Sequence, residues 1–220
     1  MDKKVLILDI DGTLTNSKKE ITPKTLEAML KVQEAGHTIM IASGRPTHGV
    51  KWVSDALQLE KFGGYELCFN GARITNVKTK EVVYQQVFPK DFIEPLYQYA
   101  LNHNMGLVTY EDDTVIAGTE INEHIEFEAR LNHMQLKRVD NFADYITFNI
   151  NKCLFTADVD VAPDLEKELA GMYDGKLSIY RSEPFFIEAM PLGVDKAASL
   201  DRSRSEERRV GKECRSRWAP

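Results

Sequence analysis

The segment KVLILDIDGTL at residues 4–14 decides how this sequence folds. It begins with a short apolar run rich in branched side chains, which is typical of a strand buried on both faces of a sheet. The run ends at Asp9, and Asp11 and Gly12 follow directly. Ligands of open α/β sheets bind beyond the carboxyl ends of the strands, so these residues are candidates for a ligand site.

Strands and helices alternate after this segment. The pair Thr22-Pro23 is typical of a helix start, and Gly36 of a helix end. Apolar runs predict strands at 37–42 and 66–69, with a helix at 47–57 between them. This strand-helix-strand-helix-strand order predicts an α/β fold with a doubly wound parallel sheet.

The pattern changes after residue 72. Alternating residues over 73–88 predict a hairpin that turns at 78–80. Beyond it we expect helices at 90–102, 121–131 and 163–173, and strands at 106–110, 114–117, 151–156, 176–181 and 185–189. We interpret 83–191 as an inserted α+β cap domain, which separates a core formed by 1–82 and 192–201.

Composition excludes several classes of protein. The net charge of −6 argues against a nucleic acid partner, and no apolar run approaches the roughly 18–20 residues of a membrane span. The apolar run near the N-terminus is too short, and acidic residues follow it too soon, for a signal peptide. Three scattered cysteines (Cys68, Cys153 and Cys214) predict free thiols in a reducing compartment, the cytoplasm. The sequence predicts no oligomeric state.

Asp9 and Asp11 are the strongest candidates for chemistry. Two carboxylates one residue apart at a strand end can share a phosphate and a Mg²⁺ ion. One can attack phosphorus while the other protonates the leaving oxygen and later activates water. Gly12 allows the backbone to turn closely around a ligand. A surface Asp-x-Asp-Gly turn without any ligand is the alternative interpretation.

Three further polar segments follow strands or the insertion. The second predicted strand ends in SGRP at 43–46, where Ser43 could meet the same phosphate or simply cap the next helix. The third ends in Asn70-Gly71, which a plain turn would also explain. Lys196 follows the insertion and could neutralise a phosphate, although a single lysine is usually solvated.

Together these segments resemble a known family. The order D-x-D-G-T-L, S-G-R-P, F-N-G-A, an insertion and G-x-D-K is similar to the haloacid dehalogenase superfamily. Within it, the chain resembles the Cof-type sugar-phosphate phosphatases with a class IIB cap, from residue 3 to about residue 200. The resemblance implies a Mg²⁺-dependent hydrolase of small phosphorylated metabolites, most of all sugar phosphates.

The resemblance also implies a role for each motif. Asp9 would form an aspartyl-phosphate intermediate, and Asp11 would be the general acid and base. Mg²⁺ would bind the Asp9 carboxylate and the Asp11 carbonyl, and Ser43 and Lys196 would hold the phosphate. The other residues expected around the phosphate are Gly12, Thr13, Gly44, Arg45, Asn70 and Gly71.

The C-terminal part departs from the family pattern. The family's Gly-Asp-x-x-Asn-Asp motif is absent, and residues 202–220 carry seven Arg or Lys against three Glu. We therefore predict a truncated core with a basic tail at 202–220 that is disordered or foreign to the protein. Loss of the motif would weaken Mg²⁺ binding and turnover and would leave the strand at 5–8 as an exposed edge.

Two other functions compete with the phosphatase. A phosphomutase of the same superfamily would pass the phosphate to a second sugar hydroxyl instead of water. A non-catalytic fragment would bind a partner through its basic tail. Dinucleotide binding is disfavoured, because no Gly-x-Gly-x-x-Gly follows the first strand.

Overall fold

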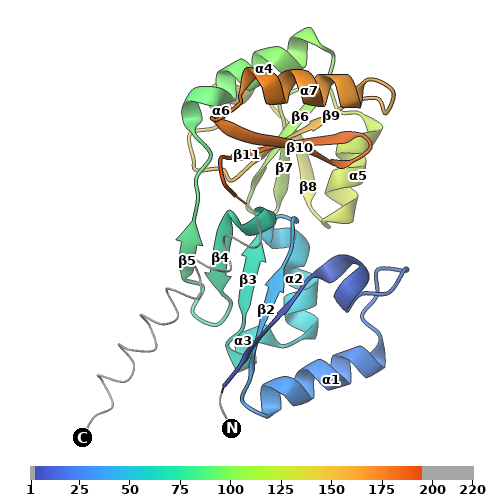
Figure 1. Ribbon diagram of the computed structural model, residues 1–220, viewed down its shortest axis with the longest axis vertical. Helices are drawn as coiled ribbons and strands as arrows, with labels where there is room; N and C mark the ends of the chain where they lie inside the picture. Colours follow the sequence, from blue (N-terminus) through green and yellow to red (C-terminus); the bar gives the residue numbers. More distant parts are fainter. Residues whose placement is uncertain (1–2, 195–220) are drawn as a thin grey trace, which may run out of the picture.

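The computed structural model describes residues 3–194, which form two β-sheets, one above the other in Figure 1. The first sheet has the order β1-β2-β3-β4-β5. Its strands are β1 (Val5–Leu8), β2 (Thr38–Ala42), β3 (Tyr65–Cys68), β4 (Arg73–Asn76) and β5 (Val82–Gln85). The first three are parallel, and β4 and β5 are antiparallel to their neighbours. The helices between its strands are α1 (Pro23–Glu34), α2 (Thr47–Ala56) and α3 (Leu59–Phe62).

The second sheet is largely antiparallel and has the order β10-β11-β9-β6-β7-β8. Its strands are β6 (Gly106–Glu111), β7 (Thr114–Ala117), β8 (Gln135–Arg138), β9 (Cys153–Thr156), β10 (Leu177–Glu183) and β11 (Phe186–Pro191). Its helices are α4 (Ile93–Asn102), α5 (Glu123–Leu131), α6 (Phe142–Tyr145) and α7 (Ala162–Met172). Helices α4 and α7 lie on the side of this sheet away from the first sheet (Figure 1).

The predicted α/β fold is confirmed. Strands β1, β2 and β3 follow the predicted parallel order, and the predicted hairpin is the pair β4 and β5. Helix α1 begins at Pro23, where the side chain of Thr22 accepts a hydrogen bond from the Thr25 amide at 3.2 Å. Local signals were sufficient here because β1 and β2 are short, largely apolar runs and α1 has a capping residue before a proline.

Three short elements were not predicted, namely α3, β8 and α6. The strand β8 has the sequence QLKR and is largely exposed at the edge of its sheet, so it lacks an apolar alternation. Helices α3 and α6 have four residues each, too few to show helical periodicity. Their conformations depend on neighbouring segments rather than on their own sequence pattern.

The burial predicted for the first strand was wrong. Val5 and Ile7 are 37% and 38% exposed, although a strand buried on both faces was expected. Over residues 3–194, β1 is the edge strand of its sheet and pairs only with β2. The described part of the chain therefore shows the exposed apolar edge that the sequence also predicted.

The first sheet extends slightly beyond the predicted boundary between core and cap. β5 ends at Gln85 and pairs with β4, so a boundary between 82 and 83 falls inside this strand. The division of the chain into core and cap domains stays a prediction. The segments 195–201 and 202–220 lie outside the described residues.

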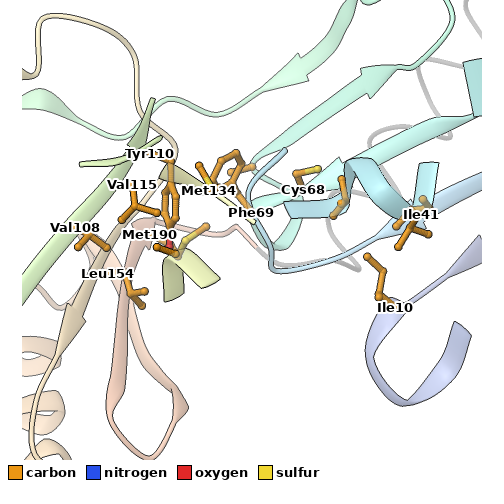
Figure 2. Close-up of a cluster of buried hydrophobic side chains, with 14 of the residues drawn as sticks. Ile10, Ile41, Cys68, Phe69, Val108, Tyr110, Val115, Met134, Leu154 and Met190 are labelled. Carbon is orange, nitrogen blue, oxygen red and sulfur yellow. The ribbon is translucent and has the colours of Figure 1, made fainter. Parts of the chain in front are cut away.

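One hydrophobic cluster connects the two sheets. Figure 2 shows it running from Ile10, in the turn after β1, and Ile41, in β2, through Phe69 to Val108 and Tyr110 in β6. The rings of Phe69 and Tyr110 are 5.7 Å apart between centroids. This continuous apolar contact buries the ends of both sheets and fixes how the loops between them face each other.

Cys68 and Cys153 are buried free thiols, as predicted, and Cys214 lies outside the described residues. Over 3–194, the helices are all too short or too polar to cross a membrane.

The close approach of α2 to the segment after α5 gives a stability prediction. A Cβ atom on Gly49 would lie 2.3 Å from Oδ1 of Asn132, whose amide nitrogen donates to Glu128 Oε1 at 2.8 Å. Because Asn132 is only 1% exposed, it has little room to move. We expect Gly49→Ala to lower the free energy of unfolding by about 1–3 kcal/mol in urea denaturation.

Gly171→Ala is the matched control, because a Cβ atom there would meet nothing within 4 Å. Gly171 lies inside α7, so this change should raise the free energy of unfolding by about 0.5–1 kcal/mol. Equal stability of the two variants would show that α2 and Asn132 are not in close contact.

Candidate active site

Asp9 and Asp11 lie in a wide turn at the carboxyl end of β1. The amide of Leu14 donates to Asp9 O at 3.2 Å, and the amide of Thr15 donates to Ile10 O at 3.0 Å. Gly12 adopts a φ of 77°, which glycine reaches without strain. The turn therefore reverses the chain within five residues and leaves Asp9 and Asp11 at the sheet edge.

Asp11 is held by two cationic side chains. Arg45 donates to both carboxylate oxygens at 3.2 Å, and Lys19 Nζ donates to Oδ1 at 2.7 Å. Burial alone would raise the pKa of Asp11, but the hydrogen bonds and charges of Arg45 and Lys19 outweigh it and lower the pKa. Asp11 is therefore an ionised carboxylate in this arrangement.

The loops after β2 and β3 are joined by backbone hydrogen bonds. The amide of Ser43 donates to Leu67 O at 2.8 Å, and the amide of Asn70 donates to Ser43 O at 3.1 Å. The amide of Arg45 donates to Ser43 Oγ at 3.2 Å. Gly44 lies directly against Asn70, since a Cβ atom there would be 2.7 Å from Asn70 Oδ1.

The structure brings most of the predicted site residues to one edge of the first sheet. The pairing of Leu8 with Ile41 places Asp9 beside the strand end that leads into Ser43. The others at this edge are Asp11, Gly12, Thr13, Gly44, Arg45, Asn70 and Gly71, which follow β1, β2 or β3 directly. Lys196 lies outside the described residues, so its predicted place at the site stays a prediction.

Sequence reasoning missed four residues that contact this edge. They are Lys19, which binds Asp11, and Lys152, Tyr180 and Glu188, which come from the second sheet or the loop before it. The charged Glu188 within the apolar run FFIEAM was the available signal, because a charge inside a buried strand needs a partner. The polar loop around Lys19 carries no comparable signal.

Arg45 also connects the two sheets. While its Nε and Nη2 atoms bind Asp11, its Nη1 donates to the carbonyl oxygen of Leu131 at 2.8 Å, at the C-terminal end of α5. Its side chain is only 10% exposed. The guanidinium group therefore fixes the turn at Asp11 relative to the second sheet.

The residues at this edge offer oxygen ligands to a metal. Residues 3–194 contain no group of three or more His, Cys, Asp or Glu side chains arranged to hold a metal ion. Carboxylate and carbonyl oxygens at the turn are nevertheless the ligands that Mg²⁺ takes, and Mg²⁺ often binds one or two carboxylates together with water and a substrate phosphate. The donor set at Asp9 and Asp11 thus fits Mg²⁺.

The segment that contains this turn and the two polar loops matches a described protein family. A family model for haloacid dehalogenase-like hydrolases matches residues 6–208. The chain belongs to this family. It is therefore a hydrolase by family, and the resemblance inferred from its motifs is confirmed.

Individual relatives of this hydrolase agree with the family match. A haloacid dehalogenase-like hydrolase from Bacteroides thetaiotaomicron, known from its crystal structure, has 36% sequence identity with this chain and a TM-score of 0.89. The match covers 93% of this chain and 77% of that protein's chain. The 5-amino-6-(5-phospho-D-ribitylamino)uracil phosphatase YcsE of Bacillus subtilis (strain 168) is 26% identical, covering 91% of this chain and 70% of its own. A subclass IIB sugar phosphatase of the superfamily, 21% identical over 91% of this chain and 74% of its own, shares the fold with a TM-score of 0.72.

The family match bears on the predicted tail. It extends to residue 208, beyond the position 202 at which the sequence was expected to become foreign. The comparison thus does not place the end of the family-like sequence at 201. The expectation of a truncated core and a foreign tail stays a prediction.

Proposed function

We propose that this hydrolase is a Mg²⁺-dependent phosphatase of small phosphorylated metabolites. The observation that carries the proposal is the turn after β1, where Asp9 and the ionised Asp11 lie at the same edge as Arg45 and Ser43. Two carboxylates next to cationic and hydroxyl groups are suited to phosphoryl transfer, because such a site can both attack phosphorus and neutralise its charge.

In the proposed reaction an Asp9 carboxylate oxygen attacks phosphorus, and the bond from phosphorus to the leaving oxygen breaks. Asp11 in its protonated form gives its proton to that oxygen. Water then attacks the phosphorus of the aspartyl phosphate, and Asp11 takes the proton from it. The bond between Asp9 and phosphorus breaks, and inorganic phosphate leaves.

The charges around Asp11 suit the second half of this reaction. Arg45 and Lys19 lower its pKa, which favours the carboxylate form that accepts a proton from water. A bound phosphate dianion would add negative charge near Asp11 and favour the protonated form needed for the first half. Mg²⁺ bound by the Asp9 carboxylate and the Asp11 carbonyl would neutralise the phosphate oxygens.

The names of two similar proteins support a small, polyhydroxylated substrate. YcsE is named for a ribityl phosphate, and the structurally similar subclass IIB protein is titled a sugar phosphatase. Sugar phosphates are therefore the substrate class that we propose. The second sheet would close over the bound phosphate and exclude water that could compete with the ordered reaction.

The proposal is tested by phosphate release from the purified 220-residue chain. We expect Mg²⁺-dependent hydrolysis of hexose and pentose phosphates without a sugar acceptor, at a rate lowered by the absence of the Gly-Asp-x-x-Asn-Asp motif. Removing the metal with EDTA should abolish more than about 90% of this activity. Adding Mg²⁺ back should restore it, whereas Ca²⁺, with its looser coordination, should not. Release that requires a second sugar would indicate a phosphomutase, and activity unaffected by EDTA would contradict the proposed metal.

A further inference from the structure

A buried ion pair from the second sheet reaches the loops of the candidate site. Lys152, just before β9, and Glu188, in β11, have side chains that are 4% and 7% exposed, with Lys152 Nζ 3.2 Å from Glu188 Oε1. Burying two charges costs free energy unless each is fully paired and hydrogen bonded. The pair therefore requires further partners, and two of them, Asn70 and the carbonyl of Gly44, belong to the loops after β3 and β2 of the first sheet.

Glu188 fixes the side chain of Asn70. Its Oε2 atom accepts hydrogen bonds from Asn70 Nδ2 at 2.9 Å and from the hydroxyl of Tyr180 at 3.2 Å. Asn70 Nδ2 also donates to that hydroxyl at 2.7 Å. Because the carboxylate can only accept, the amide nitrogen of Asn70 must point towards it, which turns Asn70 Oδ1 towards Gly44.

Lys152 fixes the loop after β2. Its Nζ atom donates to Gly44 O at 3.3 Å. The ammonium group of Lys152 thus lies against the oxygen of the peptide between Gly44 and Arg45. The N–H of the same peptide donates to Ser43 Oγ at 3.2 Å. A cation at the oxygen polarises the peptide and strengthens its N–H as a donor. Lys152 therefore orients the backbone beside the hydroxyl expected to hold phosphate.

We propose that Lys152 and Glu188 are positioning residues, which hold the loops at Gly44 and Asn70 in the geometry that binds the phosphoryl group. This inference rests on the proposed phosphatase function of the same site. These contacts join segments that are far apart in the sequence. Lys152 and Gly44 are separated by 108 positions, and Glu188 and Asn70 by 118. The placement of the second sheet thereby sets the phosphate-binding geometry of the first.

The test removes both charges together, so that neither is left buried without a partner. In Lys152→Met/Glu188→Gln, kcat/KM should fall by about 10- to 100-fold, because misplaced phosphate loops lose orientation. The factor should be the same for every phosphate monoester, since the loops face the phosphoryl group that all substrates share. Inorganic phosphate, measured by calorimetry on the full chain, should bind several-fold more weakly.

The matched control is the ion pair between Arg181 in β10 and Glu166 in α7, with Arg181 Nε 3.0 Å from Glu166 Oε2. Both of these side chains are more exposed than those of Lys152 and Glu188. Arg181→Met/Glu166→Gln should leave kcat/KM within about twofold. A purely structural role for Lys152 and Glu188 would lower the melting temperature but leave kcat/KM per folded molecule and phosphate affinity unchanged. That result, like a loss whose size depends on the leaving group, would overturn the proposal.

Tyr180→Phe keeps the test decisive if the double variant does not fold. It removes one hydroxyl that contacts both Asn70 and Glu188, and should lower kcat/KM by about 3- to 10-fold on all substrates. A folded Tyr180→Phe variant with unchanged kcat/KM would overturn the proposal. If the unmodified chain releases no phosphate, the phosphatase proposal fails, and the affinity of the variants for inorganic phosphate decides the positioning role alone.

Discussion

Asp9→Asn should lower phosphate release by at least about 10³-fold, because an uncharged amide is a poor nucleophile towards phosphorus. Asp9 lies at the end of β1 and is half-buried, and Asn has nearly the same shape. We therefore expect the melting temperature to change by no more than a few degrees. Initial rates with saturating Mg²⁺ and a sugar phosphate measure the effect.

The control for this prediction is Asp55→Asn. Asp55 lies on α2, is well exposed and pairs with Lys51 at 2.7 Å, so its loss should change the rate less than about twofold. Acid quenching during turnover should trap labelled phosphate on the unmodified chain and none on Asp9→Asn. An Asp9→Asn variant that keeps a tenth of the activity would exclude Asp9 as the nucleophile.

Asp11→Asn should slow hydrolysis by an amount that depends on the leaving group. A sugar hydroxyl leaves as a strongly basic alkoxide unless it is protonated, so loss of the acid should cost about 10²- to 10⁴-fold. A nitrophenolate leaves without protonation, so the first step with p-nitrophenyl phosphate should be slowed far less. Comparing kcat/KM, which reports this first step, for the two substrates on the same preparation measures the difference.

The second step provides an independent signature of Asp11. Without its base, water attacks the aspartyl phosphate slowly, so p-nitrophenyl phosphate should give a burst of about one nitrophenolate per chain. Asp11 is 36% exposed, so losing its ion pairs should cost at most about 1 kcal/mol of stability. Equal losses of kcat/KM on both substrates, with no burst, would indicate that Asp11 only orders Arg45 and Lys19.

Local sequence patterns were sufficient to predict the first sheet. Its parallel strands are short apolar runs, and the polar residues of the expected site follow each run directly. Parallel strands end at the same edge of a sheet, so the sequence alone assigns Asp9, Ser43 and Asn70 to one place. The apolar pattern of residues 5–8 alone predicted burial on both faces, whereas over residues 3–194 β1 is an edge strand. Only the absence of the Gly-Asp-x-x-Asn-Asp motif indicated this edge, because burial depends on neighbours that are distant in sequence.

The second sheet was predicted less completely. Its helices α4, α5 and α7 and most of its strands were predicted, but α6 is too short to show periodicity, and β8 is polar, largely exposed and gave no signal. The residues through which this sheet contacts the site were also missed. The position of Glu188 inside an apolar run indicates that it needs a partner, but nothing in the local sequence of Lys152 or Glu188 identifies Gly44 or Asn70 as that partner.

The sequence by itself determined the family, the parallel β-α-β order and the identity of the carboxylates, because these depend on residue types at short spacings. Only the tertiary structure decided which cations hold Asp11 and which buried charges hold the loops at Gly44 and Asn70. A buried charge is tolerated only where oppositely charged and hydrogen-bonding partners surround it. Those partners are set by how two sheets pack together, which no short segment of the chain encodes.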